Sequence, residues 1–303
     1  MVNGDNLNNN ILYNKIKLND FTSEDIIDIT KDEMMGIITE LINKNSNQEN
    51  FLLNISHDLR GHLNVILSVM QMINYSGVHG SDKKASEYMD IVRRNSLKML
   101  RLINNLIDTT KLENNYYVLN KKNLDIVSMI ESTVNCIDKY AKQKNIQLIF
   151  DTNKEECIMA IDPGVLDRII MNLLSNAIKF SYSNTNVYID IFVVNDEIKI
   201  SIRDEGPGIS EEYQEKIFNR FYQLSKKSEN DIIGSGIGLD LVNYLVKSMD
   251  GDIKLQSKDG QGCEFILTFP ISTVEEKEDY CLNDNKSNKI QMLEVEFSDI
   301  YNN

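Results

Sequence analysis

The sequence has few cysteines, no long apolar run and no surplus of basic residues, and each deficit argues against a class of protein. Its four cysteines are far apart and include no C-x-x-C pair, which argues against a zinc site or a disulfide framework and fits a reducing compartment. The longest nearly apolar run, 65–73, is about half of the roughly 20 residues that span a bilayer, and no signal peptide follows Met1. We therefore expect a cytoplasmic chain without a transmembrane segment.

Acidic residues outnumber basic ones, since 46 Asp and Glu against 32 Lys and Arg give a net charge of −14. A nucleic-acid partner needs surplus Lys and Arg to displace counterions, so no direct nucleic-acid binding is expected. With 303 residues and 42% hydrophobic residues, the chain has room for two domains with buried cores. The segment 1–44 predicts one or two short helices and is too short for a sensor domain of about 100 residues.

Two amphipathic helices are predicted in the first half of the chain. Apolar residues recur at alternating steps of three and four from Leu52 to Ile73, and the pattern resumes from Tyr88 to Leu106 after the breaker segment 76–81. An antiparallel hairpin of two such helices buries little, because each helix has only one partner. We expect two chains to combine into a four-helix bundle, which makes the protein a homodimer.

The remainder predicts an α+β domain with a largely antiparallel sheet. Helices are expected over 124–144, 162–180 and 236–249, and strands over 146–150, 157–161, 187–194, 198–203, 252–257 and 263–269.

These patterns divide the chain into five parts. The predicted parts are an N-terminal segment for signal input (1–44), a helical hairpin (45–112), a linker (113–123), an α+β domain (124–271) and an acidic tail (272–303). Residues 290–297 of the tail alternate like a strand, which fits either an edge strand or a docking segment.

His57 stands in the run Ser56-His57-Asp58-Leu59-Arg60 of the first predicted helix. It lies about 200° around the helix from Leu59, so it is expected to face solvent, within reach of a second domain and of a partner protein. An imidazole that is mostly neutral near pH 7 is a competent nitrogen nucleophile, and the Asp58 carboxylate can hold its tautomer by a hydrogen bond. His62 and His79 lack such a setting and are interpreted as structural.

Paired asparagines occur some 115 residues later. Asn172 and Asn176 are four residues apart and project from one face of a predicted helix, with Lys179 about a turn further on. Amide oxygens can ligate a Mg²⁺ ion that keeps most of its water and phosphate ligands, and a lysine can neutralise phosphate charge. Such a pair also arises by chance in an Asn-rich chain, so its meaning depends on the motifs that come after it.

Two glycine-rich runs complete the pattern. Asp204-Glu-Gly206-Pro-Gly208 follows a strand, where the glycines let the backbone approach a base and the carboxylate can accept from an adenine amino group. Gly234-Ser-Gly236-Ile-Gly238 opens a helix whose free N–H groups can hold a triphosphate. The polar segment 223–233 between them suits a lid over a bound nucleotide. The order of these signals indicates phosphoryl transfer from ATP to a histidine.

These residues resemble the sequence boxes of the two-component sensor histidine kinases, in the same order, over about residues 45–271. The boxes are 56–60 (phosphoacceptor), 172–180 (N box), 204–209 (first glycine box), 217–221 (F box) and 234–239 (second glycine box). The resemblance implies a dimerising helical hairpin followed by an ATP-binding sandwich of the GHKL type. It also implies a role for each of several residues: phosphorylated His57, acid/base partner Asp58, Mg²⁺ ligands Asn172 and Asn176, adenine reader Asp204, and Arg220 near the phosphates.

Two positions depart from that family pattern. The family usually has Thr and Pro at the fourth and fifth positions after the histidine, where this chain has Gly61 and His62. The resemblance assigns the Thr a part in dephosphorylating the partner regulator, so we expect weak phosphatase activity. Loss of the proline removes an expected helix kink, which Gly61 partly offsets by loosening the same turn.

The leading hypothesis is an ATP- and Mg²⁺-dependent histidine kinase that autophosphorylates His57 in a dimer and passes the phosphoryl group to an aspartate of a response regulator. Its input would come through the N-terminal segment or from a separate sensor protein. One alternative is a catalytically degenerate module that binds ATP and dimerises, which the altered Gly61-His62 pair allows. Another is a GHKL ATPase that drives a conformational clamp, which leaves the exposed His-Asp pair without a purpose.

Overall fold

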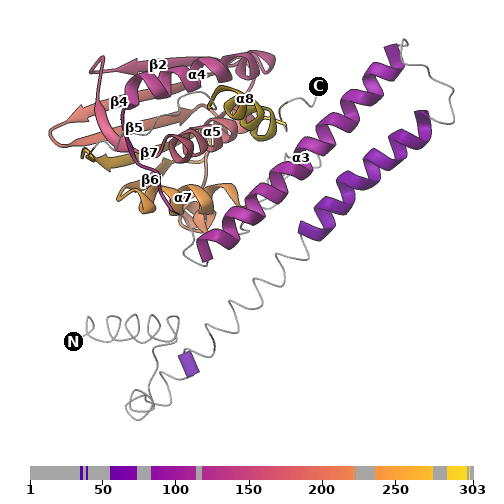
Figure 1. Ribbon diagram of the computed structural model, residues 1–303, viewed down its shortest axis with the longest axis horizontal. Coiled ribbons are helices and arrows are strands. Elements are labelled where there is room, and N and C mark those ends of the chain that lie inside the picture. Colours follow the sequence, from indigo (N-terminus) through magenta and orange to yellow (C-terminus); the bar gives the residue numbers. More distant parts are fainter. Residues whose placement is uncertain are drawn as a thin grey trace. The chain divides into compact units, whose positions relative to one another are not determined.

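The computed structural model describes residues 35–36, 39, 55–73, 83–113, 118–220, 222, 236–275, 285–298 and 300 (Figure 1). The chain forms two compact units, 1–60 and 61–303, which are treated separately. Most of the predicted N-terminal segment, the turn at 76–81, the lid at 223–233 and Gly234 lie outside the described residues. Within the described ranges, no helix is both long enough and apolar enough to cross a membrane.

Both predicted helices of the hairpin are confirmed over the described residues. Residues 55–73 are helical, and α3 (Lys83–Glu113) is longer at both ends than predicted. Within the second unit, Nδ1 of His62 donates a hydrogen bond to Oδ1 of Asn95 at 3.0 Å, so His62 joins the first helix to α3 and is structural as expected. The helix continues through Gly61 and His62, at the point where the family pattern has a proline.

The second half folds around a five-stranded sheet with the order β2-β4-β5-β7-β6. Its strands are β2 (Gln147–Thr152), β4 (Asn186–Val194), β5 (Glu197–Asp204), β6 (Asp252–Ser257) and β7 (Cys263–Pro270). Only β2 and β4 are parallel, and every other neighbouring pair is antiparallel, as the sequence predicts. A two-stranded antiparallel ladder of β1 (Lys122–Asp125) and β3 (Ile158–Ile161) lies outside this sheet.

Three helices, α4 (Ile126–Gln143), α5 (Pro163–Phe180) and α7 (Gly238–Ser248), cover one face of the sheet (Figure 1). Strand β4 shows this one-sided cover, because Ile189 and Ile191 are fully buried while Phe192 of the other face is 47% exposed. The result is an α/β sandwich that follows a helical hairpin in the chain, which confirms the predicted fold class.

Local sequence signals place the starts of α4 and α5. Each helix begins after an aspartate whose carboxylate accepts hydrogen bonds from backbone N–H groups of the first turn: Asp125 caps α4 and Asp162 caps α5. Pro163 follows Asp162 at the first helical position, where its missing N–H costs no hydrogen bond. Helix α5 lies at the centre of the core and is buried on most sides, which positions the asparagines that it carries.

The strand-like alternation at 290–297 proved misleading, because this segment is part of helix α8 (Asn285–Glu296) and the turn after it. Leu293, Val295 and Phe297 are buried at 3%, 3% and 0% exposure. Hydrophobicity does not follow burial here, because the apolar Ile290 is 58% exposed while the polar Glu296 and Ser298 are buried. The segment therefore shows no apolar stripe of 3.6-residue period, and its two-residue alternation is a coincidence. The segment packs on the rest of the chain as a docked helix.

Candidate functional site

Helix α5 carries the three predicted site residues of the N box on a largely buried element. Asn172 is 2% exposed and Lys179 is 5% exposed, whereas Asn176 is half-buried. The Nζ atom of Lys179 lies 5.5 Å from the centroid of the Phe180 ring, a cation–π distance. Burial of the Asn172 amide is costly unless it meets a polar group, which suits this part of α5 to a polar ligand.

The structure brings the N box against the second glycine box. A Cβ atom on Gly238, the first residue of α7, would lie 2.5 Å from Oδ1 of Asn172, so a larger residue here would displace the Asn172 amide. The Nδ2 group of Asn172 is buried without a hydrogen-bond partner in the described part of the chain. A buried amide left unsatisfied beside a glycine-rich helix start indicates a position for a ligand. The preceding Gly236 has φ 69°, a left-handed conformation.

Asp204 ends β5 with its side chain turned into the protein, and it is 6% exposed. Its Oδ1 atom accepts hydrogen bonds from the backbone N–H of Gly206 at 2.8 Å and of Cys263 at 3.3 Å. Both bonds end at the same oxygen, so the carboxylate is held in one orientation. Burial raises the pKa of Asp204 above its usual value, and the two backbone hydrogen bonds oppose that rise.

Close backbone contacts hold the loop after Asp204. A Cβ atom on Gly208 would lie 2.0 Å from the carbonyl oxygen of Lys258, and one on Gly262 would lie 2.0 Å from the carbonyl oxygen of Asp204. Both glycines have positive φ, 70° and 79°. Gly262, in the turn between β6 and β7, was not predicted from the sequence, because its partner is close only in the folded sheet. The G-x-G spacing of Gly260 and Gly262 is the one sequence signal that marks this turn.

Replacing Gly208 by alanine is expected to lower the free energy of unfolding by at least about 2 kcal/mol and to weaken nucleotide binding, since the new methyl group meets both an unfavourable φ and the Lys258 carbonyl. Gly260→Ala is the matched control: its φ is 78°, yet an added Cβ meets nothing within 4 Å. Chemical denaturation and ATP titration of both variants check the prediction. Equal destabilisation of the two would show that the close approach at Gly208 is unimportant.

Arg220, in the predicted F box, is held by the second glycine-box helix. Its Nε atom donates to Oδ2 of Asp240 in the first turn of α7 at 2.7 Å, and the two side chains are 30% and 22% exposed. The residues just before Arg220 form the 3-10 helix η1 (Lys216–Phe218), after the short helix α6 (Glu211–Gln214). Asp240 was not predicted as a site residue, and its pairing ties the F box to the helix whose start carries Gly236 and Gly238.

His57 belongs to the other compact unit. Its side chain is 86% exposed and that of Asp58 is 49% exposed, so the predicted display of the imidazole to solvent is confirmed. Nδ1 of His57 lies 3.5 Å from Oδ1 of Asp58, a long and weak hydrogen-bond distance. Nδ1 therefore faces the carboxylate, and Nε2 lies on the opposite edge of the exposed ring.

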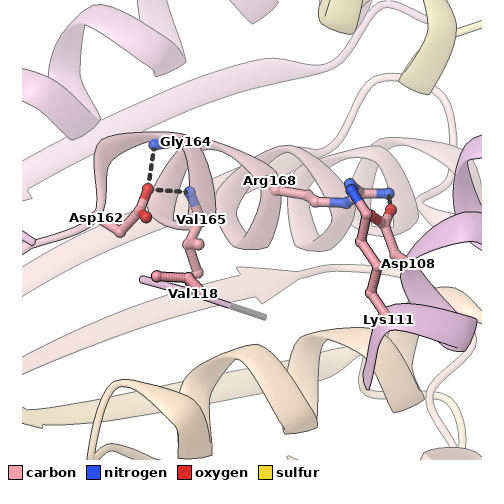
Figure 2. Close-up of a pocket in the computed structure, with 7 residues that line it drawn as sticks. All are labelled: Asp108, Lys111, Val118, Asp162, Gly164, Val165 and Arg168. Atoms are coloured by element: carbon pink, nitrogen blue, oxygen red, sulfur yellow. Dashed lines mark hydrogen bonds and ion pairs between the residues drawn. The ribbon is translucent and has the colours of Figure 1, made fainter. Parts of the chain in front are cut away.

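A polar cavity of about 460 Å³ lies elsewhere, between the C-terminal part of α3 and the start of α5 (Figure 2). It is lined by Asp108, Lys111, Val118, Asp162, Gly164, Val165 and Arg168. None of these belongs to the predicted nucleotide residues, and Figure 2 shows Arg168 reaching from α5 to Asp108 of α3. The cavity therefore belongs to the junction between the hairpin and the sandwich.

Comparison with known proteins finds two families in one chain. The family model of the His Kinase A (phospho-acceptor) domain matches residues 47–115. The model of the histidine kinase-, DNA gyrase B-, and HSP90-like ATPases matches residues 161–273. The first match contains His57, and the second contains the asparagine pair, Asp204 and the glycine-rich runs.

Several curated relatives are sensor kinases. The chain is 29% identical to the sensor protein EvgS of Escherichia coli O157:H7 over 240 residues, covering 78% of this chain and 20% of EvgS. It is 30% identical to histidine kinase P4 of Formosa agariphila, covering 85% of this chain and 19% of that protein. With the sensor histidine kinase WalK of Bacillus subtilis, 28% identity covers 80% of this chain and 39% of WalK. The chain thus spans about a fifth to two fifths of these relatives.

Solved structures share the fold. Full-length ShkA in complex with AMPPNP has a TM-score of 0.57 and 21% identity, covering 75% of this chain and 47% of ShkA. Histidine kinase AdeS of Acinetobacter baumannii has a TM-score of 0.55 and 21% identity over 72% of this chain and 98% of AdeS. With a phosphoacceptor domain followed by a GHKL-type ATPase domain, the chain belongs to the sensor histidine kinases.

Proposed function

We propose that this protein uses ATP to phosphorylate His57 and then passes the phosphoryl group to an aspartate of a response regulator. The observation that carries the proposal is that one chain contains two features. One is a solvent-exposed histidine beside an aspartate, and the other is a sandwich in which the N box contacts both glycine boxes. The relatives support it: several are sensor kinases, and histidine kinase ThkA has been solved with the response regulator TrrA. ShkA was solved with the ATP analogue AMPPNP.

In this proposal the nucleotide binds along the line from Asp204 to the start of α7. Both backbone hydrogen bonds to Asp204 use Oδ1, and Oδ2 is the oxygen that would accept from the adenine amino group. The N–H groups around Gly236 and Gly238 would hold the phosphates, as expected at the start of a helix, with Gly234 before them in the same run. Arg220, which the family resemblance puts near the phosphates, and Lys179 would add positive charge.

Asn172 and Asn176 are the residues that would hold Mg²⁺ between the helix and the phosphates. The unsatisfied amide of Asn172, next to Gly238, fits this role, because rotation about its χ2 exchanges the nitrogen and the oxygen that face the ligand. Bound Mg²⁺ would neutralise phosphate charge during transfer. The protein's own part is to hold the amides on the rigid, buried helix α5.

At His57 the exposed Nε2 would attack the γ-phosphorus of ATP. The Nε2–P bond forms as the bond from the γ-phosphorus to the β–γ bridging oxygen breaks, and ADP leaves with the electron pair. Asp58 would accept the Nδ1 hydrogen bond, which keeps the Nε2 lone pair available and stabilises the cationic ring in the transition state. Catalysis then depends mostly on positioning the ring and neutralising charge.

We also propose that the active form is a homodimer. Apolar side chains of the helical hairpin remain exposed in the single chain: Leu63, Leu67, Met70, Met72, Met89, Ile103 and Ile107. An apolar face of this kind on a helix pair is covered when two hairpins form a four-helix bundle.

The domain division that we propose is 45–112 for the hairpin, 113–123 for the linker and 124–271 for the ATP-binding domain. Residues 1–44 would be the input segment or the contact for a separate sensor protein.

The test of the proposed function is a two-stage phosphotransfer assay. The wild-type chain with Mg²⁺ and γ-labelled ATP is expected to acquire acid-labile, base-stable label, and label is expected to move to a receiver domain added afterwards. Because Gly61 replaces the Thr that serves dephosphorylation in the family pattern, the labelled regulator should then persist in the presence of the kinase and ADP. ATP binding without label would instead favour the degenerate binding module, and rapid loss of label from the regulator would contradict weak phosphatase activity.

A further inference from the structure

The C-terminal helix α8 lies beyond both family matches, which end at residues 115 and 273, yet it is packed into the fold. Phe297 is fully buried, and Leu293 and Ile300 are 3% and 8% exposed. Even the polar residues Glu296 and Ser298 are buried, at 4% and 0%. A segment this deeply buried contributes to the arrangement of the parts that it touches.

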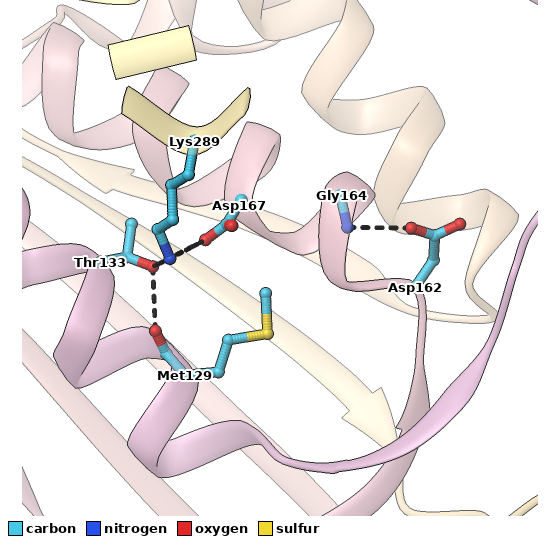
Figure 3. Close-up of polar contacts among 6 residues, drawn as sticks. All are labelled: Met129, Thr133, Asp162, Gly164, Asp167 and Lys289. Carbon is cyan, nitrogen blue, oxygen red and sulfur yellow. Dashed lines mark hydrogen bonds and ion pairs between the residues drawn. The ribbon is translucent and has the colours of Figure 1, made fainter. Parts of the chain in front are cut away.

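One side of α8 is anchored on the ATP-binding sandwich. The Phe297 ring stacks on the Tyr140 ring of α4 with a centroid distance of 4.8 Å. The Ser175 hydroxyl, between the two N-box asparagines on α5, donates to the Glu296 carbonyl at 3.1 Å. Figure 3 shows Lys289 of α8 reaching between α4 and α5, where its Nζ donates to Asp167 at 2.9 Å and to the Thr133 hydroxyl at 2.7 Å.

The acidic residues of α8 pair with α3 of the hairpin. Arg93 pairs with Glu294 at 2.7 Å, and Arg101 pairs with Glu296 at 3.0 Å. The second pair is largely shielded from solvent, with side chains 15% and 6% exposed, so it is screened by salt far less than a surface pair. Helix α8 therefore bridges α3 and the sandwich, and Arg168 of α5 pairs directly with Asp108 on the same side of α3.

The junction between α3 and the sandwich leaves some buried polar groups without hydrogen bonds. Oδ1 of Asn105 on α3 and Nε of Arg168 on α5 are buried without a hydrogen-bond partner among the residues that the structure describes. Asn105 lies one turn from both Arg101 and Asp108, on the face of α3 that meets the sandwich. Separation of the two parts returns these groups to water, which offsets part of the contact energy that separation removes.

We propose that α8 is an intramolecular clamp that holds the ATP-binding sandwich on α3 and thereby slows phosphorylation of His57. The inference rests on the proposed function, in which the sandwich must bring ATP to His57 and then leave that residue open to a regulator. A sandwich tied to α3 at three ion pairs is held in one position, so each cycle has to break the clamp. Release of α8 would be a means of activation.

The test compares initial rates of His57 labelling at saturating ATP for the wild type, Arg101→Ala and a chain truncated after Glu275. Arg101 lies on α3, outside the nucleotide residues, and its loss leaves the buried Glu296 unpaired, so α8 should detach from α3 while the sandwich stays folded. Both variants are expected to label at least about threefold faster than the wild type, with ATP affinity unchanged within about twofold. Lys254→Ala, at an exposed ion pair on β6, is the matched control and should leave the rate unchanged.

The labelling rates and hydrogen exchange of these variants can each overturn the clamp proposal. A rate that is unchanged or lower in Arg101→Ala, with ATP binding intact, overturns the clamp even if the truncated chain fails to fold. Hydrogen exchange gives a second measure: amides of α3 near residue 101 and of α8 should exchange faster in Arg101→Ala, and equal protection would also overturn it. Absence of label from the wild type would instead show that the proposed function fails, and the clamp's role in regulation would fail with it.

Discussion

Replacing His57 by glutamine is expected to abolish phosphorylation of the chain by ATP while leaving ATP binding and stability nearly unchanged. The side chain is 86% exposed, so the substitution removes the nucleophile without disturbing a packed contact. A glutamine amide nitrogen has no available lone pair for attack on phosphorus, so the loss should be complete. Label retained on the chain after denaturation in detergent and gel separation at pH above neutrality gives the measurement.

His62→Gln is the matched control for this result. His62 lies five residues later on the same helix, but its Nδ1 donates to Asn95 of α3, so it has a structural role. The control is expected to keep its label and to lose about 1 kcal/mol of hairpin stability, the usual net contribution of one hydrogen bond. Label that persists in His57→Gln would refute the assignment of His57 as the phosphoacceptor. Loss of label from His62→Gln alone would identify His62 as the phosphoacceptor instead.

Replacing Asp204 by asparagine is expected to weaken ATP binding by at least about 100-fold while the fold is kept. The new Oδ1 can still accept from the N–H groups of Gly206 and Cys263, which keeps the loop in place. In that orientation an NH₂ group replaces Oδ2. The asparagine NH₂ and the adenine amino group would then face each other as two hydrogen-bond donors without an acceptor. The buried site cannot supply water to either donor, so the mismatch is costly.

Changing the base of the nucleotide tests the same interaction between residue 204 and the adenine amino group. ITP carries a carbonyl oxygen in place of the adenine amino group, and the amide introduced by Asp204→Asn can donate to it. The preference for ATP over ITP should therefore fall at least about tenfold in this variant. Titration of both nucleotides against both proteins measures the ratio, with Asp252→Asn, an exposed carboxylate at the start of β6, as the control. An unchanged ratio would remove Asp204 from the adenine site.

The pH dependence of Asp204 has a defined sign. Burial raises its folded pKa above the usual value near 3.8, so the folded chain takes up this proton at a higher pH than the unfolded chain. The charged carboxylate therefore lowers stability above the folded pKa; this cost begins to fall as the pH drops through the folded pKa and is gone below the unfolded value near 3.8. ATP binding should weaken over the same fall in pH, because a protonated oxygen donates where adenine needs an acceptor. Asp204→Asn should lack this component of the pH dependence.

Most of the fold could be predicted from local patterns. The helices with one apolar stripe, α3, α4 and α7, and the strands with alternating burial, such as β4, match their predicted ranges to within a few residues, apart from the longer ends of α3. Strand β1 was missed, because its four residues carry no alternation and it pairs only with the equally short β3. Helix α8 was misread because its apolar residues form no stripe: Ile290 is exposed, whereas the polar Glu296 is buried.

The residues of the proposed nucleotide site could be chosen from the sequence because ligand chemistry calls for these types: an amide pair on one helix face, a carboxylate after a strand and glycines at a helix start. Their contacts depend on the packing of distant segments. Asn172 meets Gly238, Asp204 meets Cys263 and Arg220 meets Asp240 only because α5, α7 and the sheet pack together. The contacts of α8 with α3 and the sandwich also depend on tertiary packing. Ion pairs such as Arg93–Glu294 join residues about 200 positions apart, so they leave no local pattern in the sequence.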